Sequence, residues 1–75
     1  MRLLEIQEEI WVIISGFDGG IKIKNRLLQH GLFQGDKVKI IRAAPLNGPL
    51  LVKVNGREVA LGRSVAQKIM VEKVE

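Results

Sequence analysis

The chain has 75 residues, no cysteine, and 12 Lys and Arg against 8 Asp and Glu, which gives a formal net charge of +4. Its length fits a single domain over residues 1–75, because a domain needs more than about 50 residues to bury a core. The lack of cysteine excludes disulfides and thiolate metal sites and favours the cytoplasm, while 47% hydrophobic residues exclude a disordered chain.

The first predicted element is a strand over residues 8–15, EEIWVIIS, which is rich in β-branched and aromatic side chains. Its apolar residues occupy both phases of the alternation: Ile10, Trp11, Val12, Ile13 and Ile14. We therefore expect both faces of this strand to be covered and Trp11 to lie in the core. The glycine-rich segment 16–20, GFDGG, then predicts a loop.

Residues 21–30 predict a short helix, because Ile23, Leu27 and Leu28 recur at helical spacing. Gly31 follows at a position where a left-handed residue commonly ends a helix. His30, the only histidine, falls in the last turn, where a cation interacts favourably with the carbonyl end of the helix dipole. A structural role at the helix end therefore accounts for His30.

A strand is predicted after the turn at residues 34–36, because Val38 and Ile40 alternate with Lys37 and Lys39. This alternation indicates a half-buried strand.

The segment 44–50, APLNGPL, predicts a loop across which the sheet reverses. Pro45 and Pro49 cannot donate hydrogen bonds to a ladder, and Asn47-Gly48 readily adopts positive φ.

Residues 50–61, LLVKVNGREVAL, predict a β-hairpin, because Asn55-Gly56 is the preferred pair of a two-residue type I′ turn. Ser64 is expected to cap a single helical turn that runs through Gln67. The alternating segment 69–74 predicts a last strand that can close the sheet.

Together these elements predict a mainly β protein, a small SH3-like barrel of about five strands with one short inserted α-helix. Closure suits such short strands, because it protects their edges and encloses the only core available.

Most of the chain, from about Arg26 to Glu72 and more weakly back to Leu3, resembles the ferrous iron transport protein A (FeoA) family, whose members are small SH3-like barrels. The matching residues, in order, are Arg26-Leu27, Gly31-Leu32, Gly35, Ala44-Pro45, Gly48-Pro49, Gly56, Ala60-Leu61, Ala66, Ile69 and Val71. Gln34 departs from the proline that often precedes the glycine at Gly35.

This resemblance implies a small cytoplasmic accessory protein of bacterial ferrous iron uptake. Its partner would be the cytoplasmic domain of the membrane transporter FeoB, which it would bind and modulate. The alternative is a nucleic-acid-binding small barrel or a repressor-type SH3-like domain. We expect no direct membrane insertion, because the longest apolar run, residues 10–14, is far shorter than the roughly 20 residues of a spanning helix.

Reactive chemistry is sparse, which argues against an enzyme. The candidates for a catalytic base or nucleophile are few: His30 is the only histidine, and Ser15 and Ser64 are the only serines. Thr, Tyr and Cys are absent. Iron transport suggests a transition metal ion as ligand, but His30, Asp18 and Asp36 lack ligands close by in the sequence, so we expect no metal site and no cofactor.

Basic residues at positions 37, 39, 53 and 57 would favour nucleic acid if they shared one sheet face. No aromatic residue lies on those strands, and we do not expect nucleic acid as the partner.

The candidate partner-binding surface is therefore the loop that carries both prolines: Pro45, Leu46, Asn47, Gly48, Pro49 and Leu50. A proline-fixed loop presents side chains with little entropy to lose on binding. The same residues would also be needed simply to reverse the chain, and both interpretations stay open here. Leu46 is the informative residue, because a turn has no need of an exposed Leu.

Overall fold

The structure, a computed structural model, describes residues 1–74. Its sheet has the strand order β4-β3-β2-β1-β5, and neighbouring strands are antiparallel. The strands are β1 (Val12–Phe17), β2 (Lys37–Ala43), β3 (Leu50–Val54), β4 (Arg57–Leu61) and β5 (Ile69–Lys73). The prediction of a mainly β protein with five short strands is confirmed.

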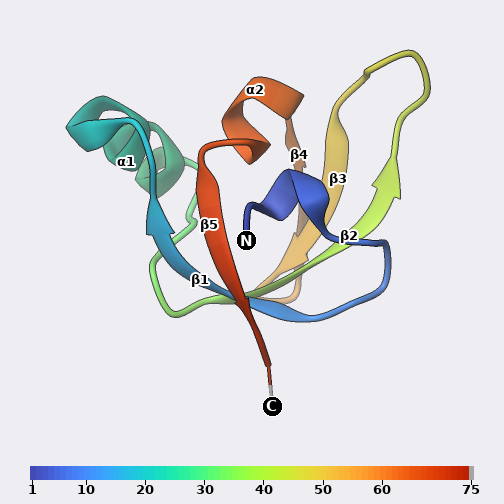
Figure 1. The fold of residues 1–75 in the computed structure, drawn as a ribbon, viewed down its shortest axis with the longest axis horizontal. Helices are drawn as coiled ribbons and strands as arrows, with labels where there is room; N and C mark the ends of the chain where they lie inside the picture. Colours follow the sequence, from blue (N-terminus) through green and yellow to red (C-terminus); the bar gives the residue numbers. More distant parts are fainter. Residues whose placement is uncertain (75) are drawn as a thin grey trace.

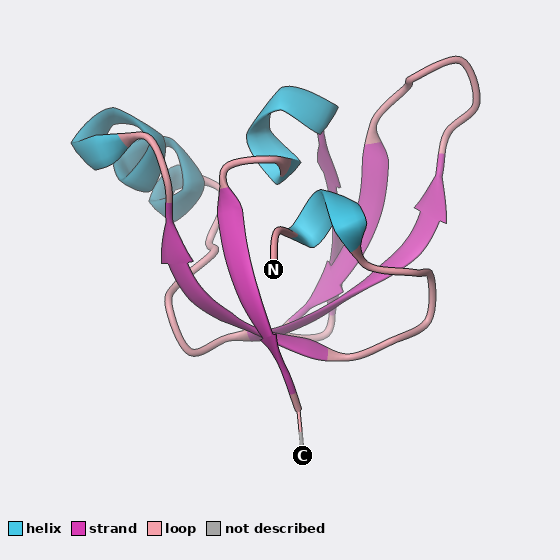
Figure 2. Ribbon diagram, in the orientation of Figure 1, coloured by secondary structure: helices cyan, strands magenta, loops and turns pink. Residues whose placement is uncertain are grey.

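Two bulges bend this sheet. One lies between Ile14 and Gly16, where β1 pairs with β5, and the other between Ile40 and Arg42, where β2 pairs with β3. A bulge places an extra residue in one strand and increases its local twist. As Figures 1 and 2 show, the sheet curls into two arms, with β5 and the end of β1 on one side and β3 and β4 on the other.

The core lies between these arms and is entirely apolar within residues 1–74. Alternate residues of each strand point inward, as the twofold periodicity of a strand requires. The buried side chains are Leu3, Val12, Ile14, Leu27, Leu32, Val38, Ile40, Leu50, Val52, Val54, Val59, Leu61, Ala66, Ile69 and Val71.

The helix α1 (Gly20–Gln29) agrees with the predicted helix over 21–30 to within one residue at each end. Gly31 has a φ of 76°, and its N–H donates to the Leu28 carbonyl at 2.9 Å. The N–H of Leu32 donates to the Leu27 carbonyl at 3.0 Å. These are the two bonds of a Schellman motif, and the full burial of Leu27 and Leu32 anchors the helix end in the core.

Two short helical segments, η1 (Leu3–Glu5) and α2 (Arg63–Ala66), lie between the arms of the sheet (Figure 1). Leu3 and Ala66 are buried there, so the two segments cover the open side of the core.

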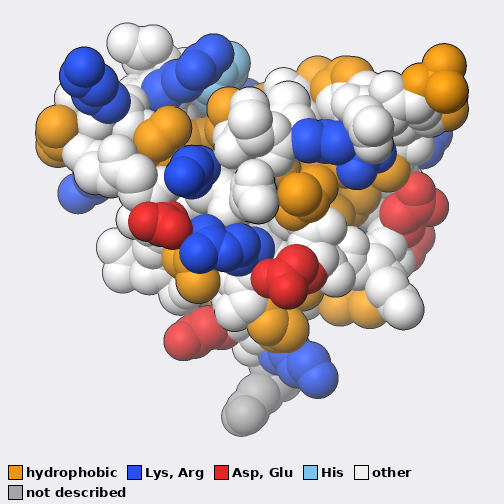
Figure 3. All heavy atoms as spheres, turned by 45° about the horizontal axis from the view of Figure 1, so that its top comes forward, with side chains coloured by type: hydrophobic (Ala, Val, Ile, Leu, Met, Phe, Trp, Pro, Cys, Tyr) orange, Lys and Arg blue, Asp and Glu red, His pale blue; other side chains and the backbone are white. Residues whose placement is uncertain are grey.

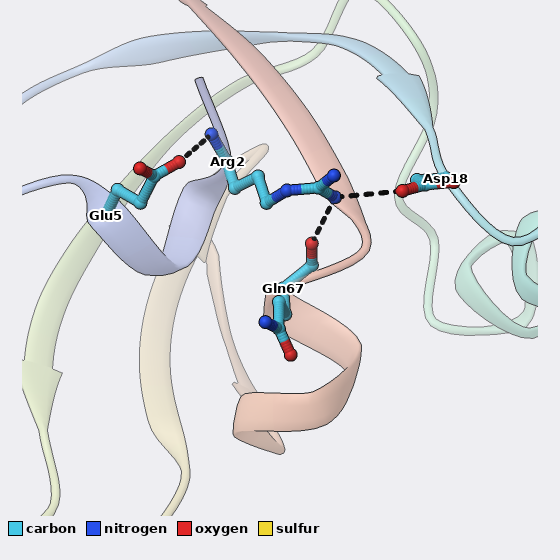
Figure 4. A network of polar contacts seen from close by, with 4 residues as sticks. All are labelled: Arg2, Glu5, Asp18 and Gln67. Carbon is cyan, nitrogen blue, oxygen red and sulfur yellow. Dashed lines mark hydrogen bonds and ion pairs between the residues drawn. The ribbon is translucent and has the colours of Figure 1, made fainter.

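Arg2 ties these segments to the end of β1, as Figure 4 shows. Its guanidinium donates to the Gln67 carbonyl at 2.8 Å and pairs with the Asp18 carboxylate at 3.0 Å. The Arg2 N–H donates to the Glu5 carboxylate at 2.8 Å. One side chain therefore joins η1, the end of α2 and the loop after β1.

Two further predicted elements, the hairpin and the last strand, are confirmed. Asn55 and Gly56 join β3 to β4 with φ values of 51° and 77°, the positive pair that a type I′ turn requires. The last strand is present as β5, with Ile69 and Val71 pointing inward.

The prediction that Ser64 caps a helical turn is wrong. The turn exists, but α2 begins at Arg63, one residue before Ser64, and no side chain caps it. Gly62 occupies the N-cap position with an extended backbone, so Ser64 lies inside the helix and is exposed.

The prediction that both faces of the first strand are covered, with Trp11 in the core, is also wrong. β1 begins at Val12, and Trp11 precedes it with 42% of its surface exposed. Val12 and Ile14 fill the inward phase, so Trp11 is left on the side of the sheet that no second layer covers within residues 1–74. The ammonium of Lys39 lies 5.1 Å from the centre of the Trp11 ring.

Candidate protein-binding site

The loop between β2 and β3, residues 44–49, is closed by hydrogen bonds of its own backbone. The Ala44 N–H donates to the Pro49 carbonyl at 3.0 Å, and the Gly48 N–H donates to the Pro45 carbonyl at 3.1 Å. Leu46 and Asn47, the two central residues of the inner turn, have φ values of 58° and 59°. Two successive positive φ values are the signature of a type I′ turn. We call residues 44–49 the Leu46 loop.

Leu46 sits at the tip of this loop with 99% of its surface exposed. Hydrophobic atoms project at the corner of the molecule where this loop lies (Figure 3). The left-handed backbone conformation disfavours a leucine by roughly 1–2 kcal/mol, because its Cβ crowds the carbonyl oxygen that follows. Leu46 therefore opposes stability through its backbone and gains nothing from burial.

Gly48 contributes by its lack of a side chain. A Cβ at this position would lie 2.8 Å from the Cβ of Ala44 and 3.1 Å from the Pro45 carbonyl oxygen. The two limbs of the loop can approach each other only because residue 48 is glycine. The sequence placed positive φ at Asn47-Gly48, whereas the structure places it one residue earlier, at Leu46 and Asn47.

Arg63, at the start of α2, holds both limbs of the Leu46 loop. Its Nε donates to the Gly48 carbonyl at 3.0 Å, and its Nη2 donates to the Ala44 carbonyl at 3.2 Å. Both bonds are partly buried. Arg63 could not be identified from the sequence, because a solitary arginine 15 residues beyond Gly48 carries no local signal of this contact.

The structure places most of the predicted surface residues together on the outside of the molecule. Pro45, Leu46, Asn47 and Pro49 are exposed, and Gly48 is half-buried. Leu50 is only 2% exposed and does not belong to this surface. It is the first residue of β3 and pairs with Leu61 of β4, so both side chains point into the core.

The candidates for reactive chemistry are not assembled into a site within residues 1–74. No hydrogen bond there joins the His30 ring to Ser15 or Ser64. No group of three or more His, Asp or Glu side chains in this part of the chain could hold a metal ion. His30 is the C-cap residue of α1, and its carbonyl accepts a hydrogen bond from Arg57.

The basic residues of the sheet do not all converge on one face. Lys39 and Lys53 pair directly on the outer side, and Lys37 lies two residues away from Lys39 on the same side. Lys39 forms an ion pair with Glu9 at 3.0 Å. Arg57 pairs instead with the inward-facing Val54 and directs its guanidinium to the His30 carbonyl.

An aromatic side chain lies beside these lysines, although it does not belong to their strands. Trp11, Lys37 and Val74, with the Asn55-Gly56 turn, line a hollow of about 400 Å³. This proximity could not be predicted from the sequence, because Trp11 lies in a different part of the chain from β2 and β3.

A chain of this length that curls five strands around one core and exposes a fixed apolar loop belongs structurally with the SH3-like domains. The FeoA of Stenotrophomonas maltophilia, solved in complex with zinc and described as a procaryotic SH3 domain protein, superposes with a TM-score of 0.79. That comparison has 26% identity and covers 96% of this chain and 89% of the other.

The family model of the FeoA domain matches residues 1–73, and the chain belongs to this family. It is 41% identical over 64 residues to a protein of Methanocaldococcus jannaschii named as a candidate Fe(2+) transport protein A, covering 85% of this chain and 76% of that protein. A Porphyromonas gingivalis protein, named as a fusion of Fe(2+) transport protein A with the Fe(2+) transporter FeoB, is 31% identical over 72 residues. That match spans 96% of this chain but only 8% of the fusion protein.

No helix in residues 1–74 combines the length and the apolar character that a membrane crossing requires.

Proposed function

We propose that this protein is a cytoplasmic accessory protein of ferrous iron uptake that binds the cytoplasmic part of a FeoB-type transporter through the Leu46 loop. The observation that carries the proposal is Leu46 itself, a fully exposed leucine in the left-handed conformation. A residue that costs stability in the free protein needs another reason to be there, and contact with a partner supplies one.

The choice of partner is supported by the relatives. The M. jannaschii relative is named for Fe(2+) transport, and the P. gingivalis relative joins a matching segment to FeoB in one polypeptide. Two proteins that occur fused in one organism work close together there, which favours contact between the separate chains in another.

The physical form of the loop suits a protein partner. Its backbone bonds and the Arg63 contacts hold it in one conformation, so little conformational entropy is lost on docking. Leu46 projects far enough to enter an apolar pocket on the partner, and the flanking prolines restrict the backbone beside it.

The test is calorimetric titration of the transporter's cytoplasmic domain with the wild-type chain, Leu46→Asp and Ile21→Asp. Burying a leucine is worth about 1.5–3 kcal/mol, so Leu46→Asp should weaken binding by about tenfold or more. Its thermal midpoint should not fall below that of the wild type, because an exposed side chain contributes little to folding and aspartate tolerates the left-handed conformation better than leucine.

Ile21→Asp is the matched control, since Ile21 is 66% exposed on α1, an element separate from the Leu46 loop. It should bind the transporter domain within about twofold of wild type, as expected for a residue outside the contact. A wild-type chain that fails to bind, or equal losses in both variants, would overturn the proposed role of the loop.

A second candidate function is nucleic-acid binding on the outer face of the sheet. It is favoured by the exposed Trp11 beside Lys37 and Lys39, since a base can stack on an indole while lysines contact phosphate. Glu9 and Glu58 lie next to the lysines of this face and reduce its charge. Titrating a mixed pool of DNA and RNA at two salt concentrations alongside the transporter domain separates the candidates, because phosphate contacts weaken steeply with salt.

A further inference from the structure

We propose that Arg63 is the positioning residue of the Leu46 loop, and that its guanidinium sets the affinity for the partner without touching it. The inference rests on the proposed function, in which Leu46 makes the contact. It adds that the contact depends on a side chain from α2, outside the loop. The geometry that points to it is the pair of bonds from one guanidinium to the two limbs of the loop, at Ala44 and Gly48.

The Leu46 loop needs such an anchor because its own backbone hydrogen bonds close the loop but do not remove the backbone strain at Leu46. Leu46 occupies a backbone conformation that L-residues avoid, so the tip has a driving force to rearrange. The inner turn is held by a single backbone bond, from Gly48 to Pro45. Leu46 is 99% exposed, so none of the described residues 1–74 packs over the tip. Restraint must therefore come from below the tip, where Arg63 lies.

Arginine suits this task because its guanidinium is a planar fork that is always charged. Nε and Nη2 point in fixed directions and reach two carbonyls that lie four residues apart in the sequence. Hydrogen bonds from a charged donor are stronger than neutral ones, and partial burial reduces competition from water. A lysine would keep the charge but place it on a flexible stem that lacks this geometry.

The anchor itself stands on a fixed element. Arg63 is the first residue of α2, and Ala66 at the other end of α2 is fully buried in the core. The bonds from Val65 and Ala66 to the Gly62 carbonyl fix the start of this helix. Arg63 thereby fixes the position of the loop relative to α2 and the core, and not only relative to β2 and β3.

The first measurement is made on the free protein, so that it does not depend on any partner. In ¹⁵N relaxation experiments the amides of Leu46, Asn47 and Gly48 should have order parameters of about 0.85 in the wild type, the value of a rigid backbone. In Arg63→Gln they should fall below about 0.6, the value of a flexible segment. Arg63→Lys should resemble Arg63→Gln, because the fork and not the charge holds the loop.

Arg57→Gln is the matched control. Arg57 also donates from its guanidinium to a backbone carbonyl, that of His30, but it lies at the opposite end of β3 and β4 from the loop. This variant loses the same charge and the same kind of bond, and it should leave the three loop amides ordered. Unchanged order parameters in Arg63→Gln, or equal loosening in Arg57→Gln, would overturn the positioning role.

The second measurement is binding to the transporter's cytoplasmic domain. Arg63→Gln should lose roughly five- to tenfold in affinity although Leu46 is intact, because the loop must then be ordered during binding. Arg57→Gln should keep wild-type affinity. If Arg63→Gln loosens the loop and affinity is unchanged, the inference is wrong while the proposed function stands. If the wild type does not bind at all, the proposed function fails, and the order parameters alone decide whether Arg63 positions the loop.

Discussion

Leu46 and Asn55 occupy comparable positions in two turns of the same kind. Asn55 is followed by Gly56, and Leu46 is followed by Asn47, with positive φ at all four residues. Asn-Gly is the pair that this backbone favours, because asparagine tolerates the left-handed region and glycine has no Cβ. The chain thus has suitable chemistry in the hairpin turn and an unsuitable leucine at the tip of the candidate binding loop. The proposed function accounts for this contrast, because a leucine that the turn itself disfavours would be retained for contact with a partner.

Replacing Leu46 by Asn should therefore stabilise the free protein. Removing the left-handed strain of a leucine should raise the free energy of unfolding by about 0.5–1 kcal/mol, since asparagine adopts this conformation more readily. Chemical denaturation measures the change directly, and titration of the transporter domain should show weaker binding by the same variant.

The reciprocal variant Asn55→Leu serves as its control and should lower the free energy of unfolding by about 1 kcal/mol. A destabilised Leu46→Asn protein would mean that the leucine side chain supports the fold.

At the scale of elements, α1 depends on how it ends. The Schellman motif at Gly31 closes the helix and brings Leu32 to the core beside Leu27. A Cβ on Gly31 would collide with the guanidinium of Arg57, which caps the same end through the His30 carbonyl. The helix terminus and the β3–β4 hairpin therefore meet at Gly31, where the positive φ favours glycine and an added Cβ would have to displace the flexible end of Arg57.

Gly31→Ala should lower the free energy of unfolding by about 1–2 kcal/mol, because alanine resists positive φ and its methyl group displaces Arg57. Thermal melting followed by circular dichroism gives the change. Gly16→Ala is the comparison, since Gly16 has no positive φ and open space where a Cβ would lie. Similar losses in the two variants would show that the helix end is not what makes Gly31 necessary.

At the scale of the whole molecule, one small core stabilises every surface described above. A chain of 75 residues is expected to have a free energy of unfolding of about 4–11 kcal/mol. The core draws residues from all five strands, from α1, from η1 and from α2. A destabilising substitution at one point of the core should therefore lower the stability of the whole fold, and unfolding should be a single cooperative transition.

Leu27→Ala tests whether the protein unfolds as one unit, because Leu27 is fully buried and packs α1 against the core. Truncating a buried leucine costs about 2–5 kcal/mol, a large fraction of the expected total. Leu28→Ala, at the half-buried neighbouring position, should cost clearly less. Circular dichroism and the dispersed methyl signals of the NMR spectrum should report one midpoint for each variant. Loss of α1 alone, with the sheet intact at higher temperature, would contradict a single core.

Local chemistry predicted a large part of the fold. The Asn55-Gly56 hairpin, the helix end at Gly31 and the alternation of Val38 and Ile40 follow from sterics and hydrogen bonds within a few residues. Such interactions are encoded where they act, so they can be read without knowing the rest of the chain. The position of the loop with two prolines follows from the same local chemistry. The exposure of Leu46 agrees with its place in that loop.

What the sequence could not supply depends on residues that meet only after folding. Trp11 is exposed because no second layer among the described residues covers the outer face of the sheet, and Leu50 is buried because it pairs with Leu61. Arg63 reaches Gly48 and Ala44 across 15 and 19 residues. By itself the sequence determined the turns, the alternation and the position of the loop, because these follow from neighbours along the chain. Only the tertiary structure decided which faces are covered and what holds the loop, because burial and long-range hydrogen bonds are properties of the packed molecule.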